Sequence, residues 1–127
     1  MKKQGEFSGT WKDEKHKVKV TIPLIIFEDT GSQIVYCPAL DISGYGHSEP
    51  EAFDSFQTSL GEFFRYTLNK NTLLSELIRM GWNIKNSKTK AMTPPPMSKL
   101  LIENENFSNI FNNFSFRKID ETIAIPA

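Results

Sequence analysis

A long amphipathic helix with an explicit start signal is the feature that most constrains the fold of this chain. Ser48 is followed three residues later by Glu51, which is the spacing of a capping box. Pro50 fits the first turn of such a helix, because that turn makes no use of the N–H that proline lacks. The pattern predicts a helix from about Glu49 to Asn69. Apolar residues recur along it at intervals of three and four, namely Ala52, Phe53, Phe56, Leu60, Phe63, Phe64 and Leu68.

Two strands joined by a tight turn are predicted ahead of this helix. Apolar and polar residues alternate over residues 17–26, where one face carries Val18, Val20, Ile22, Leu24 and Ile26. Pro23 cannot donate a hydrogen bond to a sheet, so we expect this strand to lie at an edge or to carry a bulge there. The turn-forming residues 29–32 lead into a second strand over 33–37, which completes a hairpin.

A third and a fourth strand complete the predicted core. Residues 43–46 form the third strand, in which Gly44 and Gly46 indicate a close approach of another backbone or a bulge. A second, shorter helix follows the long one, and Gly81 occupies the place of a left-handed residue at its C-terminus. We expect residues 82–84 to return to the sheet as its fourth strand. This order predicts an α+β fold, an antiparallel sheet with helices on one face.

We expect one α+β domain with additions at both ends. Residues 1–16 are a polar lead-in, 17–85 form the core domain, and 86–96 are a linker rich in lysine and proline. Residues 97–127 form a C-terminal extension with a helical pattern over 98–114. Because this extension is apolar, we expect it to pack on the core or on a second subunit.

The composition indicates a soluble, cytoplasmic protein with no membrane partner. Hydrophobic residues make up 39% of the 127, and no apolar run approaches the roughly 18 residues that span a bilayer. The chain begins with Met-Lys-Lys but lacks the apolar segment of a signal peptide. A single cysteine, Cys37, excludes an internal disulfide framework and suits a reducing compartment.

The charges balance overall, with 15 basic and 15 acidic residues, but they are segregated along the chain. Residues 21–64 contain seven acidic residues and no Lys or Arg, whereas residues 65–100 contain seven basic residues and one acidic residue. An acidic surface over the central segment would attract a basic protein and repel nucleic acid. The alternative interpretation is ordinary solvated surface.

The sequence gives little support to an enzyme. His16 and His47 are far apart, and no His, Cys or acidic residues have the spacing of a metal site. Asp41 and Glu49 could meet at one end of the sheet as paired carboxylates. Acids at turns and helix starts are, however, favoured there by local hydrogen bonds and by the helix dipole. We therefore predict no catalytic, cofactor-binding or metal-binding residue.

A binding surface fits the residues better. Aromatic residues on short strands, next to acidic residues, are typical of docking surfaces at sheet edges. The residues we select as partner-binding are Tyr36, Asp41, Tyr45, Glu49, Glu51 and Asp54. The alternative is that the aromatics belong to the core and the acids are only solvated.

Residues 36–40, Tyr-Cys-Pro-Ala-Leu, and residues 44–52, Gly-Tyr-Gly-His-Ser-Glu-Pro-Glu-Ala, resemble the HicB family of antitoxins and antitoxin-like proteins. The pattern is a strand that ends in Pro-x-Leu, a crossing of small residues, a glycine before a Ser or Thr cap, and Glu-Ala at the helix start. The resemblance covers about residues 17–85 and implies a β-β-β-α-β fold that partly matches a double-stranded-RNA-binding domain. It also implies a partner, a small basic mRNA-cleaving toxin of the HicA type, which the protein would bind and block.

Many HicB proteins also repress their own operon through a C-terminal DNA-binding segment, so operator DNA is an alternative partner. Lys85, Lys88 and Lys90 are the candidate nucleic-acid contacts. The chain departs from the family pattern in Asp41-Ile42-Ser43 and in its tail, which has no helix-turn-helix pattern and four acids against two bases over 101–127. A further alternative is an orphan relative without a toxin partner. We expect a homodimer or a higher oligomer, joined through strand edges or through the apolar tail.

Overall fold

The protein has an α+β fold built on a four-stranded antiparallel sheet, as the α+β part of the fold prediction expected. We describe it from a computed structural model that places residues 17–85 and 91–126. The strands of this sheet are β1 (Lys17–Asp29), β2 (Ser32–Cys37), β3 (Ile42–Gly46) and β6 (Phe116–Pro126). Their order across the sheet is β3-β2-β1-β6, so β3 and β6 are the edges.

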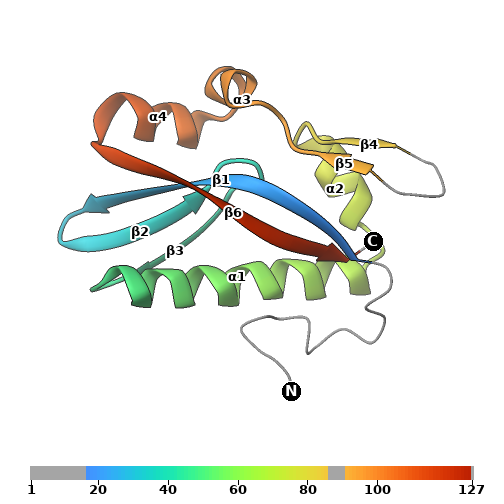
Figure 1. Cartoon of the computed structure of the whole chain (residues 1–127), viewed down its shortest axis with the longest axis horizontal. Coiled ribbons are helices and arrows are strands. Elements are labelled where there is room, and N and C mark those ends of the chain that lie inside the picture. Colours follow the sequence, from blue (N-terminus) through green and yellow to red (C-terminus); the bar gives the residue numbers. More distant parts are fainter. Residues whose placement is uncertain (1–16, 86–90, 127) are drawn as a thin grey trace.

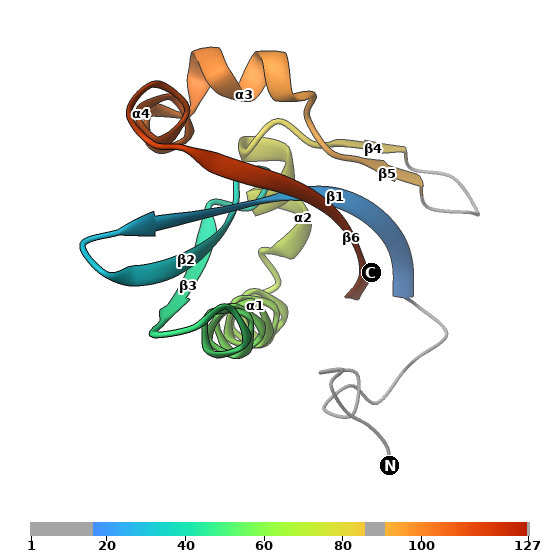
Figure 2. The same cartoon turned by 60° about the vertical axis from the view of Figure 1, so that its left-hand side comes forward.

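Helices cover both faces of this sheet, so the prediction that they lie on one face was wrong (Figures 1 and 2). The four helices are α1 (Glu49–Asn69), α2 (Leu73–Arg79), α3 (Met97–Glu103) and α4 (Glu105–Asn113). Neighbouring residues of a strand point to opposite faces, and yet Leu24–Phe27 are all buried. Ile26 lies on the face that α1 covers, whereas the Phe27 ring lies 5.0 Å from the ring of Phe114, next to α4.

The start of α1 matches the predicted capping box. The Ser48 hydroxyl accepts a hydrogen bond from the Glu51 N–H at 3.3 Å, and the Glu51 carboxylate accepts one from the His47 N–H at 2.9 Å. The buried side of the helix contains most of the predicted apolar stripe, namely Ala52, Phe56, Leu60 and Phe64. The close backbone approach predicted at the two glycines is also confirmed. A Cβ on Gly44 would lie 2.1 Å from the backbone nitrogen of Phe56, and one on Gly46 would lie 2.5 Å from the Cβ of Glu51.

The strand predicted at 82–84 does not join the main sheet. It forms β4 (Asn83–Lys85), which pairs with β5 (Ala91–Thr93) in a separate two-stranded ribbon. Part of the segment expected to be a linker is therefore folded, because Met92 of β5 is buried in the core. The indole of Trp82 ties the start of this ribbon to the core by donating to the Ala39 carbonyl at 2.8 Å. Gly81 has a φ of +100°, which confirms its left-handed conformation.

The C-terminal segment supplies the fourth strand of the sheet. β6 pairs with β1 from Phe116, opposite Phe27, to Pro126, opposite Lys17, and it buries Ile123 and Ile125. At Pro23 only β6 is beside β1, because the pairing with β2 begins at Ile25; β1 is thus locally an edge there, as its proline predicted.

The single helix predicted over 98–114 is divided at Asn104 into α3 and α4. The division occurs because the Asn104 side chain accepts a hydrogen bond from the Phe107 N–H at 3.1 Å and so caps a new helix. Both helices bury apolar residues in the common core, namely Leu100, Phe107 and Ile110. Residues 1–16, predicted as a lead-in, lie outside the described residues. Among the helices of the described chain, none is long and apolar enough to cross a bilayer.

Candidate protein-binding cleft

The short crossing between β2 and β3 forms one wall of a cleft. Its turn is closed by the Cys37 carbonyl, which accepts hydrogen bonds from the Asp41 N–H at 2.8 Å and the Leu40 N–H at 3.3 Å. Asp41 has a φ of +56°, a left-handed conformation that residues other than glycine rarely adopt, although Asp tolerates it better than most. This conformation lets the chain reverse within a few residues, and it leaves the Asp41 side chain exposed at the cleft.

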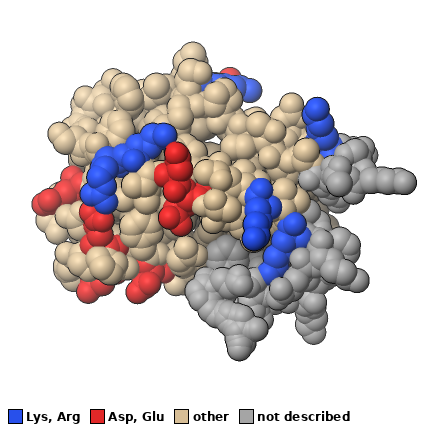
Figure 3. Space-filling view, viewed as in Figure 1, with Lys and Arg blue, Asp and Glu red and all other residues tan. Residues whose placement is uncertain are grey.

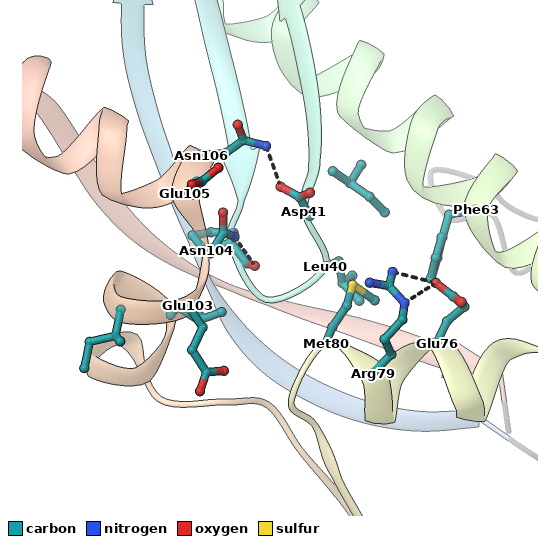
Figure 4. A pocket seen from close by; sticks show the side chains of 14 residues that line it. Leu40, Asp41, Phe63, Glu76, Arg79, Met80, Glu103, Asn104, Glu105 and Asn106 are labelled. Atoms are coloured by element: carbon teal, nitrogen blue, oxygen red, sulfur yellow. Dashed lines mark hydrogen bonds and ion pairs between the residues drawn. The ribbon is translucent and has the colours of Figure 1, made fainter.

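A hydrogen-bond network fixes this crossing to the α3–α4 junction (Figure 4). The Tyr36 hydroxyl donates to one carboxylate oxygen of Asp41 and accepts a hydrogen bond from the Asn104 amide at 2.9 Å. The same amide donates to the Pro38 carbonyl at 3.3 Å. The Asn106 amide donates to Asp41 at 3.3 Å. Asn104 therefore has two structural roles, because its oxygen caps α4 while its nitrogen holds the crossing.

The cleft has a volume of about 790 Å³ and lies between the crossing, α2 and the α3–α4 junction. Figure 4 shows that its labelled side chains come from these separate parts of the chain. The apolar residues that line it are Leu40, Ile42, Phe63, Met80, Leu100 and Ile102. The charged residues that line it are Asp41, Glu76, Arg79, Glu103 and Glu105. Ile102 is 85% exposed, an unusual state for so large an apolar side chain.

The charge of the cleft is acidic, because its one base is already paired. The Arg79 guanidinium binds the Glu76 carboxylate at 2.7 Å; this hydrogen bond lowers the pKa of Glu76 and raises the pKa of Arg79. Asp41, Glu103 and Glu105 have no ion-pair partner among the residues that the structure describes. Glu103 and Glu105 thus have no counter-charge among the described residues, and Asp41 has only a longer-range electrostatic interaction with Arg79.

The buried titratable groups next to the cleft are held in their neutral forms. Burial raises the pKa of the Tyr36 hydroxyl, and its hydrogen bond to Asp41 raises that pKa further. Burial raises the pKa of the Cys37 thiol from 9.0 to about 12, so it is protonated and a poor nucleophile at neutral pH. No group of three or more His, Cys, Asp or Glu side chains in the described part of the chain is arranged to hold a metal ion.

The selected partner-binding residues occupy two separate places. Tyr36 and Asp41 belong to the cleft, where the buried tyrosine acts through the position that it gives to Asp41. The other four lie around β3 and the first two turns of α1, namely Tyr45, Glu49, Glu51 and Asp54. The sequence pattern alone indicated a single surface for all six residues.

The surface around β3 and α1 is already partly engaged within the chain. Arg117 of β6 makes a two-bonded ion pair with Glu49, at 2.8 and 3.0 Å, which lowers the pKa of Glu49. The C-terminal strand thus brings a base to a region that has none in its own sequence. Glu51 is occupied by the capping box. Tyr45 is 65% exposed, and Asp54 is exposed as well.

The candidate nucleic-acid contacts are described only in part. Lys85 is exposed at the end of β4, whereas Lys88 and Lys90 lie outside the described residues. The sequence analysis missed the α2 and α3–α4 walls of the cleft, including Arg79, Ile102 and Glu103. The available signal was Asn104, since asparagine is a preferred N-cap residue and an apolar pattern resumes at Phe107.

We compared the chain with protein-family models, with curated proteins and with solved structures, and none of the three comparisons found a match.

Proposed function

We propose that this chain is a non-enzymatic protein-binding module, an antitoxin-like protein that resembles the HicB family and neutralises a small basic mRNA-cleaving toxin. The observation that carries the proposal is the cleft, which is lined by exposed apolar surface at Ile102 and by the carboxylates of Asp41, Glu103 and Glu105, none of which is ion-paired with a described residue. A basic partner would place Lys or Arg side chains beside these carboxylates and an apolar side chain against Ile102. Charge complementarity of this kind raises the association rate and excludes acidic competitors.

The rigidity of the crossing supports the same proposal. Tyr36, Asn104 and Asn106 hold Asp41 in place before any partner arrives. A site that is already ordered loses less conformational entropy on binding, so more of the contact energy appears as affinity. An ordinary solvated side chain would not need these hydrogen-bonding neighbours to hold it, so the network favours a binding role for Asp41.

The remaining features of the described chain favour protein binding over catalysis and over DNA binding. The pKa values of Tyr36 and Cys37 are both raised, so both groups keep their protons at neutral pH, whereas an activated nucleophile has a lowered pKa or loses its proton to a base. The helices α3 and α4 are joined by Asn104 alone, whereas a helix-turn-helix has a turn of about three to four residues. Residues 97–126 carry three bases against four acids, which is a poor match to phosphate.

A binding experiment with a matched control tests the proposal. The candidate partner is any small basic protein found to be encoded beside this chain, and its affinity is measured by calorimetry over a series of salt concentrations. We expect the double variant Glu103→Lys/Glu105→Lys to bind roughly tenfold more weakly, because two attractive contacts become repulsive. The control is Glu28→Lys, which makes a like change of charge at the exposed hairpin end of β1, outside the cleft.

Two results would contradict the proposal at different levels. If the neighbouring protein neither binds nor loses its RNA-cleaving activity in the presence of wild-type chain, the antitoxin function is wrong and the orphan alternative is favoured. If it binds but the cleft variant and the Glu28→Lys control bind equally well, the function stands and the cleft is the wrong surface.

A further inference from the structure

The two edges of the main sheet differ in how they are protected. At the β3 edge, α1 lies against the strand, and the Ser55 hydroxyl accepts a hydrogen bond from the Tyr45 N–H at 3.2 Å. At the other edge, β6 is 11 residues long and pairs on its outer side with no strand in the described part of the chain. It contains no proline before Pro126. A long strand with an open edge is a template for pairing with another strand.

The charges along β6 have a pattern that is complementary to itself. Two bases, Arg117 and Lys118, precede Ile119, and two acids, Asp120 and Glu121, follow it. Basic and acidic side chains accordingly lie side by side over β6 at the front of the molecule (Figure 3). We infer that β6 is a dimerisation surface, on which β6 of a second copy of this chain pairs antiparallel about a two-fold axis at Ile119. This inference is independent of the proposed function.

The register of this pairing follows from the positions of the charges. With the axis at Ile119, Lys118 lies opposite Asp120 of the second copy, and Arg117 lies opposite Glu121 of the second copy. If the two-fold axis were moved by one residue, it would pass through Lys118 or through Asp120. Lys118 would then lie opposite Lys118 of the second copy, or Asp120 opposite Asp120 of the second copy. Like charges directly opposite each other destabilise an antiparallel pair, whereas opposite charges stabilise it. The register at Ile119 therefore places an opposite charge across from each of the four charged residues.

Three of the charged residues of β6 already have partners within the chain. Arg117 is bound by Glu49, so Glu121 of the second copy would be an additional partner for it. Lys118 lies 3.3 Å from Asp120 on the same face of β6, in an ion pair that is about half exposed. In the dimer this ion pair would lie beside the same ion pair of the second copy, which runs in the opposite direction. The four side chains would then alternate between positive and negative charge. Ile119 is half-buried at the edge, and its second copy would cover the remaining surface. The result is one continuous sheet of eight strands.

A disulfide placed on the axis tests the register directly. Directly opposite residues of an antiparallel pair have Cα atoms roughly 4.5 to 5.5 Å apart, which is within the range of a disulfide. Ile119→Cys should therefore form a covalent dimer under mild oxidation. The matched control is Thr122→Cys, on the same strand, whose copies would be roughly 20 Å apart. The native Cys37 is fully buried and does not compete.

A charge exchange tests the energetics, with the oligomeric state of the full chain measured by sedimentation. We expect Lys118→Asp and Asp120→Lys each to weaken the dimer by roughly tenfold, because each places like charges opposite each other twice per dimer. The double variant Lys118→Asp/Asp120→Lys should restore the dimer, and a mixture of the two single variants should form a heterodimer. Circular dichroism checks that each variant is folded.

Either of two results would overturn the inference. One is a wild-type chain that sediments as a monomer at its highest soluble concentration. The other is a dimer in which the double variant stays as weak as the single variants, or in which Thr122→Cys forms the covalent dimer as readily as Ile119→Cys does.

Discussion

Gly44 is the residue at which the sheet and the long helix come closest. A side chain there would lie 2.1 Å from the Phe56 nitrogen and 2.6 Å from the Ala52 carbonyl oxygen, and both atoms belong to the backbone of α1. Backbone atoms of a packed helix cannot move aside as the end of a flexible side chain can. The absence of a side chain at Gly44 therefore sets the distance between β3 and α1.

We predict that Gly44→Ala lowers the free energy of unfolding by about 3 kcal/mol or more, because β3 must move away from α1 to admit one methyl group. Urea denaturation followed by circular dichroism measures the change. The control is Gly31→Asn, at a left-handed turn position where an added Cβ meets nothing within 4 Å and which asparagine tolerates. Similar stabilities for the two variants would contradict the close approach.

The Cys37 thiol makes stability depend on alkaline pH. Its pKa is 9.0 in the unfolded chain and about 12 in the folded one, so above pH 9 the unfolded state loses a proton that the folded state keeps. The contribution of this thiol to the free energy of unfolding is complete below pH 9 and is lost as the pH rises toward 12. We predict a free energy of unfolding about 2 kcal/mol lower at pH 11 than at pH 9 from this group alone.

The comparison of wild type with Cys37→Ala separates this effect from other titrations. The variant should lose less stability between pH 9 and pH 11 than wild type does, by about the same 2 kcal/mol. A residual loss is expected in both proteins, because the raised pKa of Tyr36 acts in the same direction above pH 10. Parallel stability curves for the two proteins would exclude the thiol as the cause.

At the scale of elements, local signals in the sequence were sufficient where the partners are close in the chain. Ser48 and Glu51 predicted the start of α1 because the hydrogen bonds of a capping box span only a few residues. The break at Asn104 was missed because the apolar pattern over 98–114 was interpreted as one helix, and Asn104 was not recognised as the cap of a second one. The pairing of β6 with β1 could not be predicted, since nothing local in the sequence links Thr21 to Thr122, whose hydroxyls lie 2.9 Å apart.

The burial of β6 can be tested with one substitution at two sites. Ile125 of β6 is 0% exposed, and we predict that Ile125→Ala lowers the free energy of unfolding by about 3 kcal/mol, from lost burial and a cavity. Ile102→Ala, at the exposed cleft residue, should change it by less than about 0.5 kcal/mol. Thermal denaturation of both variants measures the difference, and equal effects would mean that β6 is not part of the core.

At the scale of the whole molecule, the two-sided burial of the sheet joins the predicted core and the predicted extension. The run from Leu24 to Phe27 is continuously apolar, a pattern typical of a strand that is buried on both faces. The alternating pattern over 17–26 led instead to the prediction of a strand with one buried face, and helices were therefore predicted on only one face of the sheet. The cleft could not be predicted from the sequence either. Its walls at Asp41, Arg79 and Glu103 come from segments that are far apart in the chain and that only folding brings together.

We predict that residues 17–126 unfold in one cooperative transition. Trp82 lies between the crossing and the β4–β5 ribbon, so its fluorescence reports on one region, whereas far-UV circular dichroism reports on all the helices and strands. In a Trp11→Phe background, the two signals should give the same urea midpoint. Two separated midpoints would mean that the core and the C-terminal elements are independent units.

The pairing of β1 with β6 also sets the order in which the sheet can be completed during folding. β6 follows every other described element, so Val20, Ile22 and Leu24 of β1 have no partner strand until the chain beyond residue 115 is available. Contacts between segments so far apart in the chain incur the cost of loop closure before they stabilise anything, which slows folding. Until β6 has paired, the outer edge of β1 is open and apolar. The β6 segment of a neighbouring chain that is also still folding can pair with this edge. Exchange of β6 between two copies is therefore a misfolding reaction that this topology permits.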